Sequence, residues 1–196
     1  MKKYNIYIAF IFILSSVIAN AEDNIKWEID RDHSKLQFKA VYMGINDVYG
    51  QFNEYEGTIT TEDQGFDGAE VNIVIYTNSI DTDNEKRDKH LKNDRNFLYI
   101  EQYPEIRFHS TSMKKTGEKK YKMVGELTIK GKTKTEEFNV KYNGLVENQD
   151  KTKAAFVVSG KINRFDYNVD WNRSFSEGLV VSQEIDIMCT ILLVKQ

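Results

Sequence analysis

The sequence predicts an all-β fold of about eight antiparallel strands. Apolar and polar residues alternate with a period of two over most of the chain after residue 21, as in strands that are buried on one face. Turn signals that contain glycine, such as Asp67-Gly68 and Thr116-Gly117, separate these runs. The single cysteine excludes an internal disulfide, so the fold depends on its core alone. Antiparallel strands in this number form a closed barrel or a sandwich, and long strands favour a tall barrel.

The N-terminus has the pattern of a secretory signal peptide. Two lysines precede an apolar run over residues 6–18, and the Ala-Asn-Ala sequence at 19–21 is the small-residue pattern that signal peptidase reads. The alternative is a membrane anchor, but the run is shorter than the roughly 20 residues that a bilayer span needs. We therefore predict a signal peptide over residues 1–21, a single domain over residues 22–196, a periplasmic location and no membrane span after cleavage.

Charge and cysteine content narrow the classes of function. The chain has a formal net charge of −3, and loss of residues 1–21 removes two lysines and no acidic residue. A mildly acidic exported protein has no general attraction for nucleic acid. Cys189 shares its strand parity with Ile187 and Ile191, so we expect a buried, inert thiol rather than a reactive one.

The strands follow one another with short turns between them. The alternation predicts strands near residues 34–42, 47–61, 68–78, 105–114, 119–130, 133–148, 153–163 and 179–194. In the first of them Leu36 and Phe38 point one way, and Lys35 and Gln37 point the other way. Parity indicates that such residues share a face, but it leaves open which face is the interior. A strand edge left exposed would permit a homodimer.

Residues 83–97 break the alternation with a dense run of charges. Asp83 or Asn84 has the side chain that caps a helix N-terminus, and the run to Leu91 lacks glycine and proline. We therefore expect a short helical excursion between two strands.

Arg87, Asp88 and His90 lie in this excursion and admit three interpretations. The residue types favour a solvated ionic helix, with Arg87 and His90 on one helical face. The second interpretation is an anion grip, because a guanidinium donates two parallel hydrogen bonds to a phosphate or carboxylate. The third is catalysis with His90 as a base, but the sequence has no G-x-S-x-G elbow and no cysteine–histidine pair. We predict neither an enzyme nor a catalytic residue.

No metal site or cofactor is predicted. Asp81, Asp83 and Glu85 are similar to the start of a calcium loop, but Lys86 stands where that loop needs glycine. The three histidines of the chain have no zinc-site spacing.

Residues 164–177 form a second irregular segment. We interpret Arg164-Phe165-Asp166 as a buried ion pair that locks this loop, because buried charges need partners. Contact with a ligand, together with Trp171, is the alternative.

Short motifs, in order along the chain, carry a resemblance to a known family. They are Trp27-Glu28-Ile29-Asp30 with His33-Ser34, Gly50-Gln51-Phe52, Arg87-Asp88-Lys89-His90-Leu91, Tyr103-Pro104-Glu105-Ile106-Arg107-Phe108, Gly125-Glu126-Leu127-Thr128-Ile129-Lys130-Gly131-Lys132-Thr133-Lys134 and Arg164-Phe165-Asp166-Tyr167. With them the chain resembles the YceI-like family of periplasmic polyisoprenoid-binding proteins, over nearly all of residues 22–196. Asn168 stands where the family often has glycine, and asparagine also tolerates a left-handed backbone.

The resemblance implies an extended, lipocalin-like, eight-stranded antiparallel barrel with a hydrophobic tunnel for a long-chain isoprenoid or a similar amphiphilic lipid, such as an isoprenoid quinone. Arg87, Asp88 and His90 are then expected at the head group. The remaining expected ligand-binding residues are the apolar side chains of one strand parity, which would line the tunnel: Leu36, Phe38, Phe52, Val71, Ile73, Ile75, Phe108, Leu127, Ile129, Phe138, Phe156, Val158, Ile185 and Ile187.

The function expected from this resemblance is binding, with transport or storage of the lipid as the process served. Two alternatives stay open. One is an enzyme that acts on a lipid head group through His90 and Arg87, and the other is a stress-protection protein with a fully packed core and no ligand.

Overall fold

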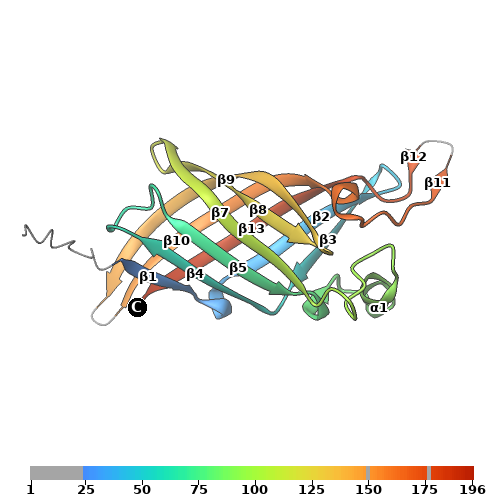
Figure 1. Cartoon of the computed structure of the whole chain (residues 1–196), viewed down its shortest axis with the longest axis horizontal. Helices are drawn as coiled ribbons and strands as arrows, with labels where there is room; N and C mark the ends of the chain where they lie inside the picture. Colours follow the sequence, from blue (N-terminus) through green and yellow to red (C-terminus); the bar gives the residue numbers. More distant parts are fainter. Residues whose placement is uncertain (1–23, 149–150, 176–177) are drawn as a thin grey trace, which may run out of the picture.

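The chain folds into one antiparallel β-barrel with a short helix beside one end (Figure 1). The structure is a computed structural model that describes residues 24–148, 151–175 and 178–196. The predicted signal peptide, residues 1–21, lies outside the described residues. Within those residues, no helix combines the length and the apolar content of a membrane span.

Long strands make up the barrel wall, and short elements connect them. The strands are β1 (Ile25–Ile29), β2 (Lys35–Tyr42), β3 (Asn46–Phe52), β4 (Tyr55–Thr61), β5 (Glu70–Tyr76), β6 (Ile80–Asp81), β7 (Glu105–Gly117), β8 (Lys120–Ile129), β9 (Lys132–Asn148), β10 (Lys151–Asn163), β11 (Ser174–Phe175), β12 (Gly178–Leu179) and β13 (Glu184–Lys195). The helices are α1 (Glu85–Asn93) and the 3₁₀ turns η1 (Arg31–His33), η2 (Thr77–Ser79) and η3 (Arg164–Tyr167).

Backbone pairing runs once around the barrel and closes on itself. The order is β1-β4-β5-β7-β8-β9-β10-β13, and β13 returns to pair with β1. One part of β13 places Lys195 opposite Trp27 of β1, and another places Ile187 opposite Phe38 of β2. The strands β1 and β2 therefore form a single interrupted strand of the wall. The predicted eight-stranded antiparallel barrel is confirmed, and the sandwich is excluded.

Three strands differ from the prediction, and one of them, expected over residues 179–194, begins only at Glu184. Residues 47–61 form two strands rather than one, because the chain turns away at Asn53, whose N–H donates to the Ser79 carbonyl (3.2 Å) instead of to a strand of the wall. Residues 25–29 form β1, which was not predicted, since five residues are too few to establish an alternation.

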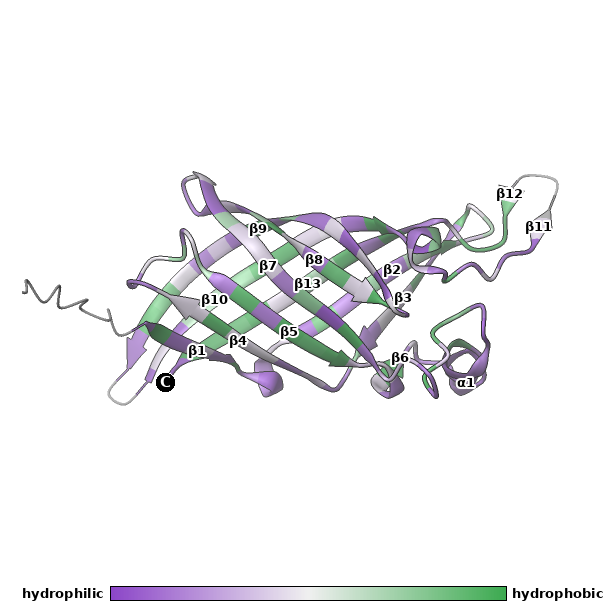
Figure 2. Ribbon diagram, viewed as in Figure 1, coloured by the Kyte–Doolittle hydropathy of each residue, from purple (hydrophilic) through white to green (hydrophobic). Residues whose placement is uncertain are grey.

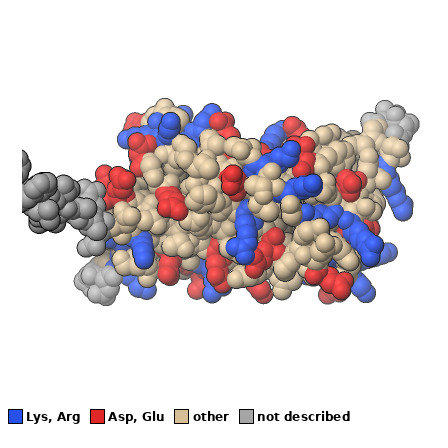
Figure 3. Space-filling model, viewed as in Figure 1, with Lys and Arg blue, Asp and Glu red and all other residues tan. Residues whose placement is uncertain are grey.

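Side chains alternate between a charged outer face and an apolar interior. Figure 2 shows hydrophilic and hydrophobic residues alternating along the strands, and Figure 3 shows both signs of charge interspersed over the face in view. Some of these charges pair across strands, as Lys39 does with Asp186 (3.1 Å) and Lys161 with Glu184 (3.0 Å). Exposed pairs contribute at most about 1 kcal/mol each. The wall is therefore held mainly by its backbone ladder and its apolar face.

One end of the barrel is closed by aromatic side chains. Phe66, from the loop between β4 and β5, is 2% exposed and packs against Trp27 (5.2 Å between ring centroids), Tyr142 (5.8 Å) and Phe156 (4.7 Å). Trp27 is fully buried, and its indole N–H donates to the Thr61 hydroxyl (3.2 Å). We call these four aromatic residues the plug.

The opposite end carries both irregular segments. Helix α1 begins after Asn84, whose side chain accepts a hydrogen bond from the Arg87 N–H (3.0 Å), so the predicted cap and helix are confirmed. The helix ends at Asn93, two residues beyond Leu91. The second segment turns at Asn168, where φ is +57°, so asparagine takes the left-handed conformation expected of it.

Two buried cations fasten these segments to the barrel. Arg164 is 4% exposed and donates to the carbonyls of Ser182, Val169, Trp171 and Val181 over 2.6–3.1 Å. The predicted Arg164–Asp166 ion pair is wrong: Asp166 is exposed, and carbonyl oxygens satisfy the guanidinium. Burial lowers the pKa of Arg164.

Lys130 is the second buried cation. Its Nζ donates to the carbonyls of Arg95 and Asn168, one from each irregular segment, and burial lowers its pKa. One ammonium group thus joins the loop after α1 to the turn after η3.

Replacing Arg164 with Met should lower the free energy of unfolding by about 2–4 kcal/mol, because four part-buried carbonyls each lose a guanidinium donor. Urea denaturation measures this loss. The matched control is Arg107→Met, since the Arg107 side chain is 63% exposed and forms its ion pair with Glu105 on the same outer face. A loss below about 1 kcal/mol at Arg164, or an equal loss at both positions, would contradict the fastening role.

Asp30 lies at the bend between β1 and β2 and joins them to β10. Its Oδ1 is 2.9 Å from His33 Nδ1, and its Oδ2 accepts a hydrogen bond from Lys153 Nζ (2.9 Å). The bond to His33, followed by the bond to Lys153, lowers the pKa of Asp30 to about 2.

The variant Asp30→Asn should therefore lose about 1–2 kcal/mol of unfolding free energy at pH 7. Because the folded pKa lies below the unfolded value, the carboxylate stabilises the fold above about pH 4 and stops doing so as the pH falls through about 2. Urea denaturation at several pH values should show the two proteins converging over that interval. A difference that stays constant from pH 7 to pH 2 would count against the assignment.

Candidate ligand-binding cavity

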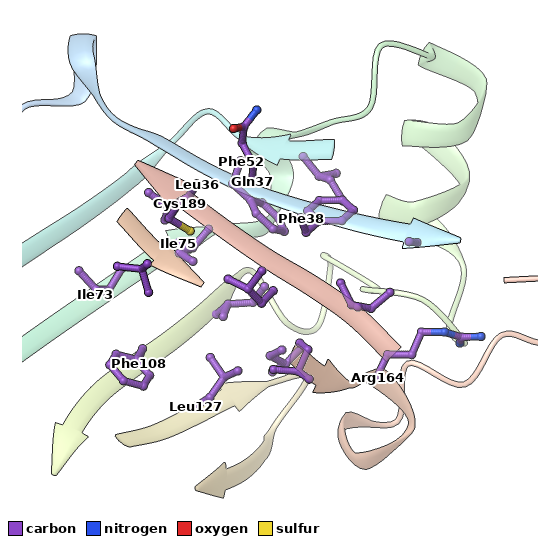
Figure 4. A pocket seen from close by; sticks show the side chains of 18 of the residues that line it. Leu36, Gln37, Phe38, Phe52, Ile73, Ile75, Phe108, Leu127, Arg164 and Cys189 are labelled. Carbon is purple, nitrogen blue, oxygen red and sulfur yellow. The ribbon is translucent and has the colours of Figure 1, made fainter. Parts of the chain in front are cut away.

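The barrel interior is hollow. A cavity of about 720 Å³ lies inside it, within the range of small-molecule sites in proteins. Figure 4 shows side chains from opposing walls facing one another across this space, among them Phe38, Ile75 and Leu127, with Arg164 at one end. Several interior side chains, such as Ile73, Val158 and Ile187, are only half-buried because they border empty space. A fully packed core is therefore excluded.

Interior glycines make room for aromatic rings in the wall. A Cβ at Gly160 would lie 2.6 Å from the Phe138 ring, and one at Gly125 would lie 2.5 Å from the Phe108 ring. Gly50 faces the Phe38 ring in the same way. Each ring thus lies against a bare stretch of backbone, so the space between the walls stays open.

The sequence-predicted site residues, with one exception, lie along this cavity. The apolar members are Leu36, Phe38, Phe52, Val71, Ile73, Ile75, Phe108, Leu127, Ile129, Phe138, Phe156, Val158, Ile185 and Ile187. Arg87 and His90 lie at one end of it. Strand parity brought the apolar set together because every second side chain of a barrel strand points inward.

Asp88 is the exception, since it is not among the lining residues. Its Oδ1 accepts hydrogen bonds from the N–H (3.0 Å) and the hydroxyl (2.5 Å) of Thr82, which follows β6. The same hydroxyl accepts a bond from Arg87 Nε (2.7 Å). Asp88 therefore positions Arg87 through Thr82 and is not placed to meet a ligand.

Arg87 is half-buried at the cavity wall and keeps donors free. Besides Nε, its Nη2 donates to the Thr82 carbonyl. Within the described part of the chain, Nη1 makes no hydrogen bond, and no ion pair includes Arg87. A half-buried guanidinium without a carboxylate partner has capacity to bind an anionic or carbonyl group.

His90 belongs to an aromatic cluster that joins the two irregular segments. Its ring meets Phe97 edge-on (5.0 Å) and Trp171 edge-on (5.7 Å), and Phe97 stacks on Trp171 (5.2 Å). His90 Nε2 lies 3.1 Å from Asp94 Oδ2. The Trp171 N–H also donates to the Asn96 carbonyl (2.9 Å), which fixes the two segments together.

The cavity opens at this end. Of the lining residues, the surface-exposed ones are Tyr42, Asn46 and His90, which lie on the β2–β3 hairpin and on α1. We call these three residues the mouth. The other end is closed by the plug, so the cavity is a blind apolar pocket with a polar entrance.

A model of the YceI-like domain matches residues 27–193. The chain belongs to the YceI-like family. A UPF0312 protein of Yersinia pestis is 31% identical over 186 residues, which cover 93% of this chain and 91% of that protein. A UPF0312 protein of Pectobacterium carotovorum is 29% identical over 197 residues, covering 100% and 99%.

Solved structures share the fold. The Campylobacter jejuni YceI protein has a TM-score of 0.64 at 25% identity, covering 78% of this chain and 87% of that one. BcnA of Burkholderia cenocepacia has a TM-score of 0.69 at 21% identity, covering 84% and 98%. A domain from Saccharophagus degradans, described as polyisoprenoid binding, has a TM-score of 0.60 at 15% identity, covering 85% and 97%.

Sequence reasoning missed part of this YceI-like cavity. Leu98 and Val169 line it from irregular parts of the chain, where no periodicity marks an inward face. Val180 and Val181 also line it, but they fall in the strand predicted over residues 179–194, whereas β13 begins only at Glu184. Cys189, expected to be buried and inert, has its side chain on the cavity wall, and burial raises the pKa of its thiol to about 11.

Cys189 should react slowly with iodoacetamide at pH 8, with a rate that climbs until about pH 11. Relative to a thiol of ordinary pKa, the thiolate fraction at pH 8 is lower on the order of a hundredfold. Mass spectrometry of the alkylated protein at a series of pH values measures the midpoint, and free cysteine is the control. A midpoint near pH 8.5 would show that the thiol does not lie in an apolar wall.

Proposed function

We propose that this protein binds a long-chain isoprenoid, or a similar amphiphilic lipid, with its chain in the barrel and its head at the mouth. The observation that carries the proposal is the apolar, blind cavity of about 720 Å³ that ends beside Arg87 and His90. Membership of the YceI-like family supports it, as does the fold shared with the polyisoprenoid binding domain of Saccharophagus degradans.

Burial of the chain supplies the driving force. Each CH₂ group moved from water into the cavity contributes about 0.8 kcal/mol, so a ten-carbon stretch contributes on the order of 8 kcal/mol before the cost of association. The wall offers almost no polar atoms, so affinity for the chain depends on its length rather than on specific hydrogen bonds.

The head group is proposed to meet Arg87 and His90. Arg87 Nη1 would donate to a phosphate or to a quinone carbonyl, with Thr82 and Asp88 holding the guanidinium in place. His90, three residues further along the same helix, would donate a further hydrogen bond.

The process served is proposed to be transport or storage of this lipid in the periplasm, after the predicted signal peptide is removed. The proposal includes no cofactor and no catalysis. The thiol on the cavity wall, Cys189, has its pKa raised to about 11 by burial, so it is a poor nucleophile near neutral pH.

One observation favours a different function, an enzyme that acts on the head group. His90 lies 3.1 Å from Asp94, the pairing that orients a general base. Incubation with farnesyl diphosphate separates the two functions: turnover that disappears in His90→Ala would favour the enzyme, and unchanged ligand would favour binding.

Native mass spectrometry of protein recovered from a bacterial periplasm tests the binding function, followed by extraction of anything bound. We expect a stoichiometric prenyl lipid that also protects Cys189 from alkylation. An empty protein whose Cys189 reacts equally with and without added geranylgeraniol would contradict the proposal.

Arg87→Ala should weaken binding of geranylgeranyl phosphate by about ten- to a hundredfold, because a charge-assisted hydrogen bond is worth about 1.5–3 kcal/mol. Binding of geranylgeraniol, which has a neutral head, should change little. Titration calorimetry measures both affinities, and Arg107→Ala on the outer wall is the control. Equal losses for the two ligands would remove Arg87 from the head-group site.

A further inference from the structure

The β2–β3 hairpin ends in apolar side chains that face solvent. Ile45 is 88% exposed, Tyr42 44% and Met43 37%. They surround Gly44 at the turn, and we call residues 42–45 the tip. Polar residues and glycine are the usual choice at a hairpin turn, so these apolar residues need an explanation.

The fold itself does not require apolar residues at the tip. Met43 has φ of +51° and Gly44 φ of +73°, so Met43 takes the left-handed conformation that asparagine or glycine adopts at lower cost. Ile45 is too exposed to add to the core. A left-handed Met43 lowers stability and an exposed Ile45 lowers solubility. Exposed apolar residues of this kind indicate contact with an apolar partner.

The tip is held in a fixed position. The Met43 N–H donates to the Val180 carbonyl (2.8 Å), and the Ser182 N–H donates to the Val41 carbonyl (2.8 Å). The Val41 N–H donates in turn to the Ser182 hydroxyl (2.9 Å). Arg164 also binds the carbonyl of Ser182. The segment that holds the tip through these hydrogen bonds is therefore itself fixed to the barrel.

The tip is continuous with the cavity. Tyr42 belongs to the mouth, and Val41, Val48 and Val181 around it line the cavity. Figure 1 shows this hairpin at the same end of the barrel as α1, away from the end at which β1 begins. Apolar side chains therefore continue from Val41 and Val181 on the cavity wall, past the Tyr42 ring, to Ile45 at the tip.

We propose that the tip inserts into the interfacial layer of a lipid bilayer and brings the mouth onto the membrane surface. This inference rests on the proposed function: a long prenyl chain resides in bilayers, and transfer through water would cost the same 0.8 kcal/mol or so per CH₂ that binding supplies. Ile45 and Met43 enter the acyl boundary, and Tyr42 lies at head-group level, where its ring is amphipathic. Arg173, whose guanidinium lies 5.8 Å from the Trp171 ring, faces lipid phosphates.

Flotation with vesicles of phosphatidylethanolamine and phosphatidylglycerol tests the docking, with protein recovered from a periplasm and its N-terminus read by mass spectrometry. We expect wild-type protein to float and Ile45→Asp to lose about tenfold in vesicle affinity. The matched control is Val146→Asp, since Val146 is 65% exposed but lies near the closed end, where its partner Lys153 faces Val194. Wild-type protein that stays in solution, or equal loss in the two variants, would overturn the proposal.

Lipid transfer separates docking from binding. Transfer of dansyl-labelled geranylgeraniol from vesicles to wild-type protein should quicken as vesicle concentration rises, and Ile45→Asp should slow it about tenfold. Affinity for the probe in detergent solution, without vesicles, should be the same in both proteins. A second outcome is that the protein binds the probe while the transfer rate stays the same at all vesicle concentrations and in Ile45→Asp. This outcome would overturn docking but would agree with the binding function.

Two further outcomes have definite meanings. If the protein binds no probe in detergent, but floats with vesicles and loses flotation in Ile45→Asp, the proposed ligand is refuted and the membrane-docking role of the tip is supported. Vesicle-free protein that sediments as a dimer, and becomes monomeric in Ile45→Asp, would assign the tip to a second copy of the chain and overturn membrane docking.

Discussion

Backbone pairing around the closed barrel is the constraint on which the rest of this structure depends. Because β13 pairs with β10 on one side and with both β1 and β2 on the other, the wall has no gap at its seam. Its ladder satisfies backbone groups without help from the interior. A sandwich needs its two sheets to interdigitate, whereas the closed ladder of this barrel holds its apolar faces apart and leaves a cavity between them.

The two ends of the barrel use different means to finish that wall. At the closed end, Phe66 packs on Trp27 and two further rings. The loop that carries Phe66 therefore covers this end of the barrel and excludes solvent from it. At the open end, Arg164 and Lys130 bind carbonyls of the irregular segments. Carbonyl oxygens satisfy these two cations without adding a buried negative charge. Both segments are thus fixed to the barrel, and this fixing places no carboxylate beside Arg87.

The entrance combines properties that a barrel strand alone cannot supply. An inward strand position offers one side chain on a regular lattice, which suits an apolar wall. Helix α1 and the segment after η3 instead bring Arg87, His90 and Trp171 to one place from distant parts of the chain. The strands thus form the apolar wall around the chain of a ligand, and the irregular segments supply the polar and aromatic side chains at its head group.

Much of the wall was predictable, because inward positions in a strand recur with period two and closure makes that face the interior. Parity placed Ile185 and Ile187 on one face of their strand, and the family resemblance supplied the tunnel that such residues line. Side-chain chemistry left Asp83 or Asn84 as the helix cap, and the structure uses Asn84. Local rules of this kind act within one strand or one turn, so they survive without knowledge of the fold.

Tertiary structure alone decided what depends on long-range contacts. It turned Asp88 away from the cavity and onto Thr82, partnered Arg164 with carbonyls in place of Asp166, and added Val180 and Val181 to the wall. It also decided that the barrel is hollow, since the same apolar residues would serve a packed core equally well. The sequence by itself determined most of the strands, which residues share a face within each of them, and the resemblance to the family. Closure determined the empty volume, because only the diameter of the finished wall sets how far apart those faces lie.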